Sequence, residues 1–346
     1  MATGYAQLAY ESTPGNEGNV PTLSTKKLFP PALSVDLGAK AEHLGRGDEI
    51  RNLDEEPALV PEAFTAEHSI ECRAYPDVTA FLFKWLLGPP VTTTGDGVIT
   101  APDASTIPAG AYRHVWTSPF GPAGPYPQTA DLVAAYKDQG VFYRAKGCGL
   151  SQLSIENAER GGVMLKASGP ALYVARIADP ALTPTYESLG IKPWTSGNFT
   201  IPNWLSGSAN CEKSGMSIEF SNPQEPYTSC QTASKWADQL EKTDTPISVT
   251  GNAPKRLIDI DDWDALMAAT GFATLAQWIS DSTIGVTGYP YKFFIEMTNA
   301  QYVDGGPEPL TNKRRLGAQF NWRATNASGT PGSVKVTIIN ATASYA

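Results

Sequence analysis

The sequence predicts a mainly β protein with helical additions, in which the strands run antiparallel. Two observations carry this prediction. Several segments alternate apolar and polar residues with the period of two that a strand with one buried face requires. Two other segments, residues 76–87 and 261–280, instead have the wider apolar spacing that is typical of a helix.

The most regular pattern is the stretch CGLSQLSIENAERGGVMLKASG, residues 148–169. Its two halves alternate, and the Gly161-Gly162 pair between them can take the positive φ angles that a tight reversal needs. We therefore expect a hairpin with one buried face. The residues expected on that face are Leu153, Ile155, Asn157, Val163, Leu165 and Ala167.

A second clear strand is FTAEHSIECR, residues 64–73, with Phe64, Ala66, His68, Ile70 and Cys72 on its apolar side. His68 is therefore expected to be a hydrogen-bonded structural residue, and Cys72 a small core residue. Further strands are predicted at residues 111–117, 141–146, 215–221, 246–251, 291–298, 316–324 and 333–343.

Residues that typically begin or end helices flank the two predicted helical segments. The segment 76–87 begins with Pro76 and is followed by Gly88-Pro89-Pro90, which would end it. The segment 261–280 follows a group of aspartates, Asp259, Asp261, Asp262 and Asp264, which we interpret as helix-capping residues rather than a cation site. Its apolar stripe is interrupted at Gly271.

Three regions are predicted along the chain. Residues 1–60 hold no sustained period and are expected to form an extended N-terminal arm and loop that docks on another surface. Residues 61–185 and 186–346 form two β-rich halves, because the order strand, helix, strand, strand recurs in both. The short sequences LSIEN and MSIEF also echo each other. A duplicated domain and a single β sandwich with decorations both fit this pattern.

Composition excludes some functions. The formal net charge is −9, so the chain lacks the basic character of a nucleic-acid binder. No secretory signal is visible, and the most apolar stretch, residues 80–88, is interrupted by Lys84, so no membrane segment is expected. We expect a soluble protein made in a cytoplasm. Cys211 and Cys230 could form a disulfide in an oxidising setting, although nothing requires one.

The sequence contains no recognisable catalytic signature. There is no GxxxxGK[ST] phosphate loop, no HExxH zinc motif and no GxSxG elbow. The three histidines, His43, His68 and His114, offer no triad arrangement. We therefore expect no enzyme, no metal and no cofactor.

Two charged segments are candidates for contacts between copies of the chain. One is an arm segment of mixed charge, and the other is a compact basic run before a strand. Opposite charges on neighbouring copies could pair, while a solvated loop and a solvated turn are the alternatives. The predicted contact residues are Arg46, Asp48, Glu49, Arg51, Asp54, Lys313, Arg314 and Arg315.

The segment FYRAKGCGLSQLSIENAERGGVMLKASG resembles the tail tube proteins of long-tailed, siphovirus-like bacteriophages. In that family an aromatic strand leads to Gly-Cys, an alternating strand, Gly-Gly and a return strand. The order of the FTAEHSIECR strand and the final VTIINATASY strand is similar as well, so the resemblance extends from about Leu44 onward.

The resemblance implies an antiparallel β sandwich or partly closed β barrel with a flanking helix. Such proteins form stacked rings around a lumen through which genomic DNA passes, and they meet tail terminator, tape-measure and baseplate proteins. If the chain holds two tube-like halves, three copies would make a ring, and otherwise six would. Its location would be the virion tail, with strand edges joining neighbouring subunits and carboxylates keeping DNA from binding the lumen.

A carbohydrate-binding or adhesin β sandwich is the alternative function, because Trp194, Trp204 and Trp236 lie in loop-like sequence contexts. A hydrolase on a β scaffold would need a paired acid and base, and no such pair can be selected among the 35 acidic residues.

Overall fold

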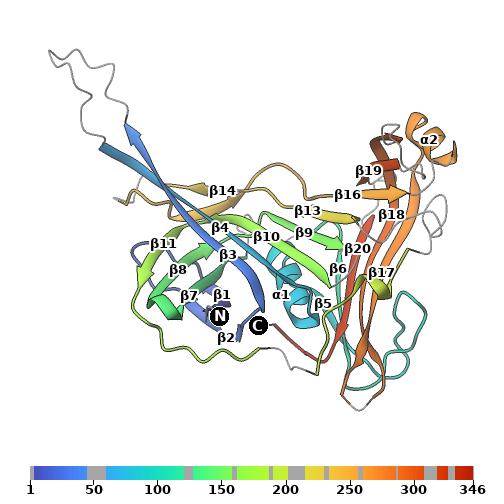
Figure 1. Ribbon diagram of the computed structural model, residues 1–346, viewed down its shortest axis with the longest axis horizontal. Helices are drawn as coiled ribbons and strands as arrows, with labels where there is room; N and C mark the ends of the chain where they lie inside the picture. The colour runs from blue at the N-terminus through green and yellow to red at the C-terminus, as the bar shows by residue number, and fades with distance from the viewer. Residues whose placement is uncertain are drawn as a thin grey trace.

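The computed structural model describes residues 4–44, 60–120, 128–157, 162–186, 190–201, 215–229, 234–255, 260–285, 287–307, 318–325 and 332–345. These residues form two large antiparallel sheets with a buried helix between them, which confirms the predicted β sandwich with helical additions (Figure 1). Within the described residues both sheets are open, because each ends in edge strands.

The smaller sheet, here called sheet A, has five strands. In spatial order they are β11 (Tyr173–Ile177), β8 (Val141–Cys148), β7 (Ala130–Tyr136), β1 (Gly4–Thr13) and β2 (Thr22–Leu28).

The larger sheet, sheet B, has thirteen strands. Its main path is β3 (Ala32–Leu44), β4 (Val60–Arg73), β10 (Val163–Ala171), β9 (Gln152–Asn157), β13 (Ser217–Ser221), β16 (Ser248–Lys255), β19 (Ala318–Ala324), β18 (Pro290–Pro307), β20 (Val334–Asn340), β6 (Tyr112–Thr117) and β5 (Val91–Thr94). Two strands lie off this path: β17 (Phe272–Thr283) pairs with β18, and β12 (Phe199–Thr200) pairs with β17. The remaining elements are the pair β14 (Gln224–Tyr227) and β15 (Gln239–Lys242), the helices α1 (Pro76–Leu87) and α2 (Ile260–Met267), and the short 3-10 turns η1 (Lys137–Gln139) and η2 (Ser196–Asn198).

The predicted hairpin is β9 and β10. Leu165 lies opposite Ile155, and Ala167 lies opposite Leu153. All six residues assigned to the inner face are buried. The hairpin also pairs with β4 through β10, where Ile70 lies opposite Ala167 and Cys72 lies opposite Leu165, so three predicted strands share one inner face.

Helix α1 spans the predicted residues and holds the two sheets together (Figure 1). On one side Phe81 stacks on Tyr10 of sheet A, with ring centroids 4.1 Å apart, and the Tyr10 hydroxyl donates to the Phe81 carbonyl. On the other side Trp85 stacks on His68 of β4 at 5.2 Å. Each large apolar side chain buried in this way contributes roughly 1.5–3 kcal/mol, so α1 is the centre of the core.

The prediction of a helix over residues 261–280 is wrong for its second part. Helix α2 ends at Met267, and residues 272–283 form strand β17. In β17 every second residue, from Phe272 to Ser282, is buried. Trp278 stacks on Phe293 of β18 at 4.6 Å. Pairing with β18 therefore determines the conformation of this segment, and the apparent helical stripe was a chance overlap of two periods.

The prediction of an extended arm over residues 1–60 is also wrong for its first part. Strand β1 lies between β7 and β2 in sheet A, and residues 5–11 are buried. Its ladder with β7 runs from Gly4, opposite Tyr136, to Tyr10, opposite Ala130. The segment lacks alternation because one face packs on α1 and the other is also covered, as in a strand buried on both sides.

Two sets of four strands follow each other in one stretch of sheet B. The first set is β3-β4-β10-β9, in which β3 comes from the predicted arm and the other three strands come from the first half, and the second set, β13-β16-β19-β18, comes from the second half. They meet where β9 pairs with β13, so the echoing sequences LSIEN and MSIEF lie side by side, with Ile155 opposite Ile218. Both halves share one hydrophobic core. The domain boundaries and the duplication stay predictions.

Candidate assembly surfaces

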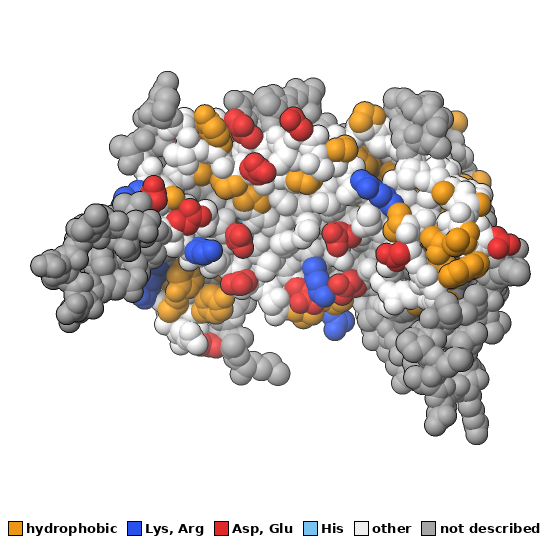
Figure 2. Space-filling view, turned by 90° about the horizontal axis from the view of Figure 1, so that it is seen from above, with side chains coloured by type: hydrophobic (Ala, Val, Ile, Leu, Met, Phe, Trp, Pro, Cys, Tyr) orange, Lys and Arg blue, Asp and Glu red, His pale blue; other side chains and the backbone are white. Residues whose placement is uncertain are grey.

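One face of sheet B is polar and open to solvent. On β4, β10, β9 and β13 the residues between the core positions point away from α1, and many of them carry charge. Figure 2 shows acidic and basic side chains spread over the middle of this face. The outward charged residues on the first strands of the sheet are Asp36, Lys40, Glu42, Glu67, Glu71, Lys166, Glu156 and Glu219.

Carboxylates exceed cations on this polar face. The Lys166 ammonium lies 2.8 Å from a Glu156 carboxylate oxygen, and both side chains are about half exposed, so the pair is a weak surface contact. Pairing with Glu156 also raises the pKa of Lys166. Because Lys40 is then outnumbered by the remaining carboxylates, the face carries a negative field that would repel phosphate.

A long hairpin made of β3 and β4 projects from the body of the molecule (Figure 1). Strand β10 covers β4 only between Ala66 and Arg73. Beyond that point Leu44 still lies opposite Val60, so the outer part of the hairpin is a two-stranded ribbon that gains a single bridge, from Phe64 to Trp236. A ribbon of this kind is marginal alone and is suited to packing against another surface.

The predicted contact residues lie outside the described residues. Arg46, Asp48, Glu49, Arg51 and Asp54 belong to residues 45–59, between β3 and β4. The basic residues at 313–315 belong to residues 308–317, between β18 and β19. The contacts assigned to both segments therefore stay predictions.

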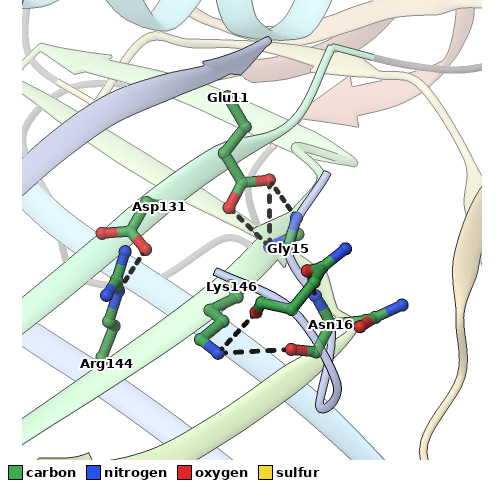
Figure 3. Close-up of polar contacts among 8 residues, drawn as sticks. Glu11, Gly15, Asn16, Asp131, Arg144 and Lys146 are labelled. Atoms are coloured by element: carbon green, nitrogen blue, oxygen red, sulfur yellow. Dashed lines mark hydrogen bonds and ion pairs between the residues drawn. The ribbon is translucent and has the colours of Figure 1, made fainter. Parts of the chain in front are cut away.

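A buried carboxylate lies where the connection between β1 and β2 crosses sheet A (Figure 3). Glu11 is 3% exposed, and its carboxylate accepts hydrogen bonds from the backbone N–H groups of Gly15, at 3.1 Å, and Gly147, at 3.0 Å. Gly147 has φ of 59°, and a Cβ there would lie 2.6 Å from the Gly15 carbonyl oxygen, so only glycine fits. Burial raises the pKa of Glu11 to about 7, despite these hydrogen bonds.

Other charges surround Glu11. Asp131 accepts a hydrogen bond from Arg144 Nε at 2.5 Å, yet burial outweighs this ion pair and raises the pKa of Asp131. The Lys146 ammonium donates to the carbonyls of Asn16 and Asn19 in the same connection. Sequence reasoning missed this cluster. The available signal was a glutamate at the end of the apolar strand 4–10. Through these hydrogen bonds the cluster holds the β1–β2 connection against β8. We therefore interpret it as a structural cluster.

His68 and His114 have structural roles. His68 is 3% exposed, and its Nε2 lies 2.8 Å from the Gly149 carbonyl oxygen, as predicted. Burial lowers the pKa of His68 to about 4. His114 is held between Thr92 and the end of β20. Within the described ranges no group of three His, Cys, Asp or Glu side chains is arranged to hold a metal ion. Cys72 and Cys148 are buried free thiols, while Cys211 and Cys230 lie outside those ranges.

The aromatic residues that suggested glycan binding do not form an exposed platform where they are described. Trp194 is fully buried and packs on Phe293 at 5.3 Å. Trp236 is half-buried between Phe64 and Tyr173. Trp204 lies outside the described residues.

The predicted capping residue Asp262 is buried, and its carboxylate accepts a hydrogen bond from the Tyr302 hydroxyl at 3.0 Å.

Comparison with protein families decides between the two functions that the sequence left open. The sequence profile described as phage tail tube protein matches residues 2–324, which is nearly the whole chain. The chain belongs to the phage tail tube protein family. Membership makes it a structural component of the virion tail, a setting in which tube proteins associate with copies of themselves and with other tail proteins. Comparison with curated proteins gives no match.

The tail tube assignment agrees with the fold. Broad antiparallel sheets with open edge strands and a projecting ribbon are features that can pair with other subunits. No helix in the described part of the chain is long and apolar enough to cross a membrane.

Proposed function

We propose that this tail tube protein assembles side by side into rings, and that the rings stack into the hollow tail tube through which genomic DNA leaves the virion. Membership of the tail tube family carries this proposal. The tail terminator, tape-measure and baseplate proteins are the partners that such a tube requires at its ends and in its lumen.

Three copies of the chain form each ring. The support for this number is the two equal sets of four strands, β3-β4-β10-β9 and β13-β16-β19-β18, joined through β9 and β13. In both sets the second strand leads into a helix and the last two strands are a hairpin. A chain with two such sets supplies two of the six positions in a ring of pseudo-six-fold symmetry.

Edge pairing joins the copies. Strand β3 pairs only with β4 in the described residues, so its other edge is open. Residues 301–307 of β18 pair with β19 on one side, and no described strand pairs with their other side. Because β18 and β9 hold corresponding places, the β9–β13 pairing inside the chain is a template for pairing β18 with β3 of the next copy.

The polar face of sheet B then lines the lumen, where its excess carboxylates keep DNA from binding as it slides. The β3–β4 hairpin reaches the neighbouring ring, and the charged residues between its strands and between β18 and β19 contribute contacts there.

Negative-stain electron microscopy at increasing protein concentration, combined with the mass in solution, tests this function. The expected result is rings or tubes of uniform width with three copies per ring. Rings of six copies would reject the two-half arrangement and keep the tube. A monomer at every concentration, also in the presence of the tail tip on which tubes begin to grow, would reject the tube.

A further inference from the structure

Helix α2 exposes an apolar surface that no described part of the chain covers. Trp263 is 42% exposed and Met267 is 70% exposed, and residues four apart lie on the same side of a helix. Val303 on β18, the strand on which α2 packs, is 56% exposed. Figure 2 shows hydrophobic side chains gathered at the right-hand end of the molecule, the end at which Figure 1 places α2.

A second apolar surface lies where β1, β7 and the beginning of β3 meet, away from α2 (Figure 1). It is an open groove of about 800 Å³, lined mainly by proline, alanine and tyrosine. Leu33, Tyr136 and Tyr186 in this groove are 60%, 43% and 46% exposed. Arg73, at the end of β4, adds one cation to its lining.

The corresponding helix of the first half is covered by the second half. Helix α1 follows β4 as α2 follows β16. Phe83, seven residues after Pro76, packs on Phe220 of β13 at 5.2 Å and on Phe293 of β18 at 5.6 Å. Met267, seven residues after Ile260, holds the same place in α2 but is exposed. Inside the chain, therefore, β13 lies against the helix of the preceding half.

We propose that the exposed face of α2 docks in the groove at the beginning of β3 in a second copy of this chain. Strand β3 holds the place in the first set of four strands that β13 holds in the second set, so the neighbouring copy covers α2 as β13 covers α1. The exposed Asp264 on α2 and Arg73 in the groove supply opposite charges for this contact. The inference rests on the proposed ring and identifies its side-to-side junction. Two different surfaces meeting in this way form a heterologous contact, which generates a ring when the rotation between successive copies closes.

Cysteine cross-linking tests the junction. In the double variant Leu33→Cys/Met267→Cys each copy carries one thiol on each surface, so mild oxidation of assembled rings links copies in series. We expect a ladder of linked copies, whereas Leu33→Cys alone and Met267→Cys alone give none. The single variants also control for the natural cysteines. If rings form and the double variant gives no ladder, the inference is overturned and the tube function stands. If the unmodified chain forms no rings, also in the presence of the tail tip, the function itself fails.

An assembly measurement gives a second test. Met267→Asp introduces a carboxylate on the docking surface, and burial of an unpaired charge opposes docking. The matched control is Val98→Asp, because Val98 is 78% exposed and lies in neither surface. We expect Met267→Asp to raise the concentration needed for ring formation by at least about tenfold, with an unchanged thermal midpoint of the monomer. The control should assemble normally. Assembly of Met267→Asp at the normal concentration would overturn the inference.

Discussion

At the scale of single residues, Glu11 shows how the fold keeps a charge that burial disfavours. The carboxyl has a pKa of about 7 in the fold, against an ordinary value of 4.5. A carboxyl with a raised pKa binds its proton more tightly in the folded state than in the unfolded state. Its contribution to stability is therefore largest below pH 4.5 and is lost as the pH rises from 4.5 to about 7.

Glu11→Gln should remove this pH dependence and keep an oxygen that accepts from Gly15 or Gly147. As the pH rises from 5 to 8, the free energy of unfolding of the variant should increase relative to that of the unmodified protein by roughly 2 kcal/mol. Urea unfolding at both pH values measures the difference. Parallel stability curves for the two proteins would show that Glu11 does not titrate in this range.

At the scale of elements, the sequence predicts well where one face of a strand packs on the core. The β9–β10 hairpin and β4 have one face on α1 and one in solvent. Apolar and polar residues therefore alternate along their sequences. Helix α1 was predicted with its observed ends, because Pro76 and Gly88 mark them.

The two wrong predictions have a common cause. Strand β1 is covered on both sides, so it lacks alternation. Strand β17 is strand because it pairs with β18, a contact that no local pattern contains. The Glu11 cluster was missed for the same reason, since Glu11, Asp131 and Arg144 come together only through the pairings of sheet A.

Shortening the projecting hairpin should separate ring formation from stacking. Ala41 lies opposite Phe64, so an Asn-Gly turn that replaces residues 42–63 can close the two strands at that pair. The core part of β4, paired with β10 from Ala66 to Arg73, remains. We expect rings with a thermal midpoint within a few degrees of the full chain, roughly the effect of less than 1 kcal/mol, and no long tubes by electron microscopy. Normal tube length would exclude a stacking role for the hairpin.

At the scale of the whole molecule, one continuous stretch of sheet from β3 to β18 presents a polar face, while the opposite face, α1 and sheet A hold the core. Because the core lies on the opposite face, the side chains of the polar face do not contribute to the hydrophobic core. The charges of the polar face can therefore change without loss of the fold, and their effect on DNA can be measured directly.

Glu71→Lys/Glu219→Lys reverses two charges on the polar face and should make assembled tubes retain short DNA duplexes at low salt. Retention should fall steeply as salt increases, because phosphate contacts release counterions. The control, Asp138→Lys/Asp281→Lys, has the same change of charge on exposed positions of η1 and β17. Co-sedimentation of labelled duplex with tubes measures retention. Equal retention by the two variants would exclude the polar face as the lumen lining.

The position of strand β20 determines when this sheet can be completed during synthesis. The strand lies between β18 and β6, with Ile338 opposite both Phe293 and His114. Until residues 334–340 leave the ribosome, these edges of β18 and β6 lack the strand that fills the space between them. A nascent chain therefore holds an incomplete sheet, and a finished subunit exists only after almost all of these 346 residues have been translated.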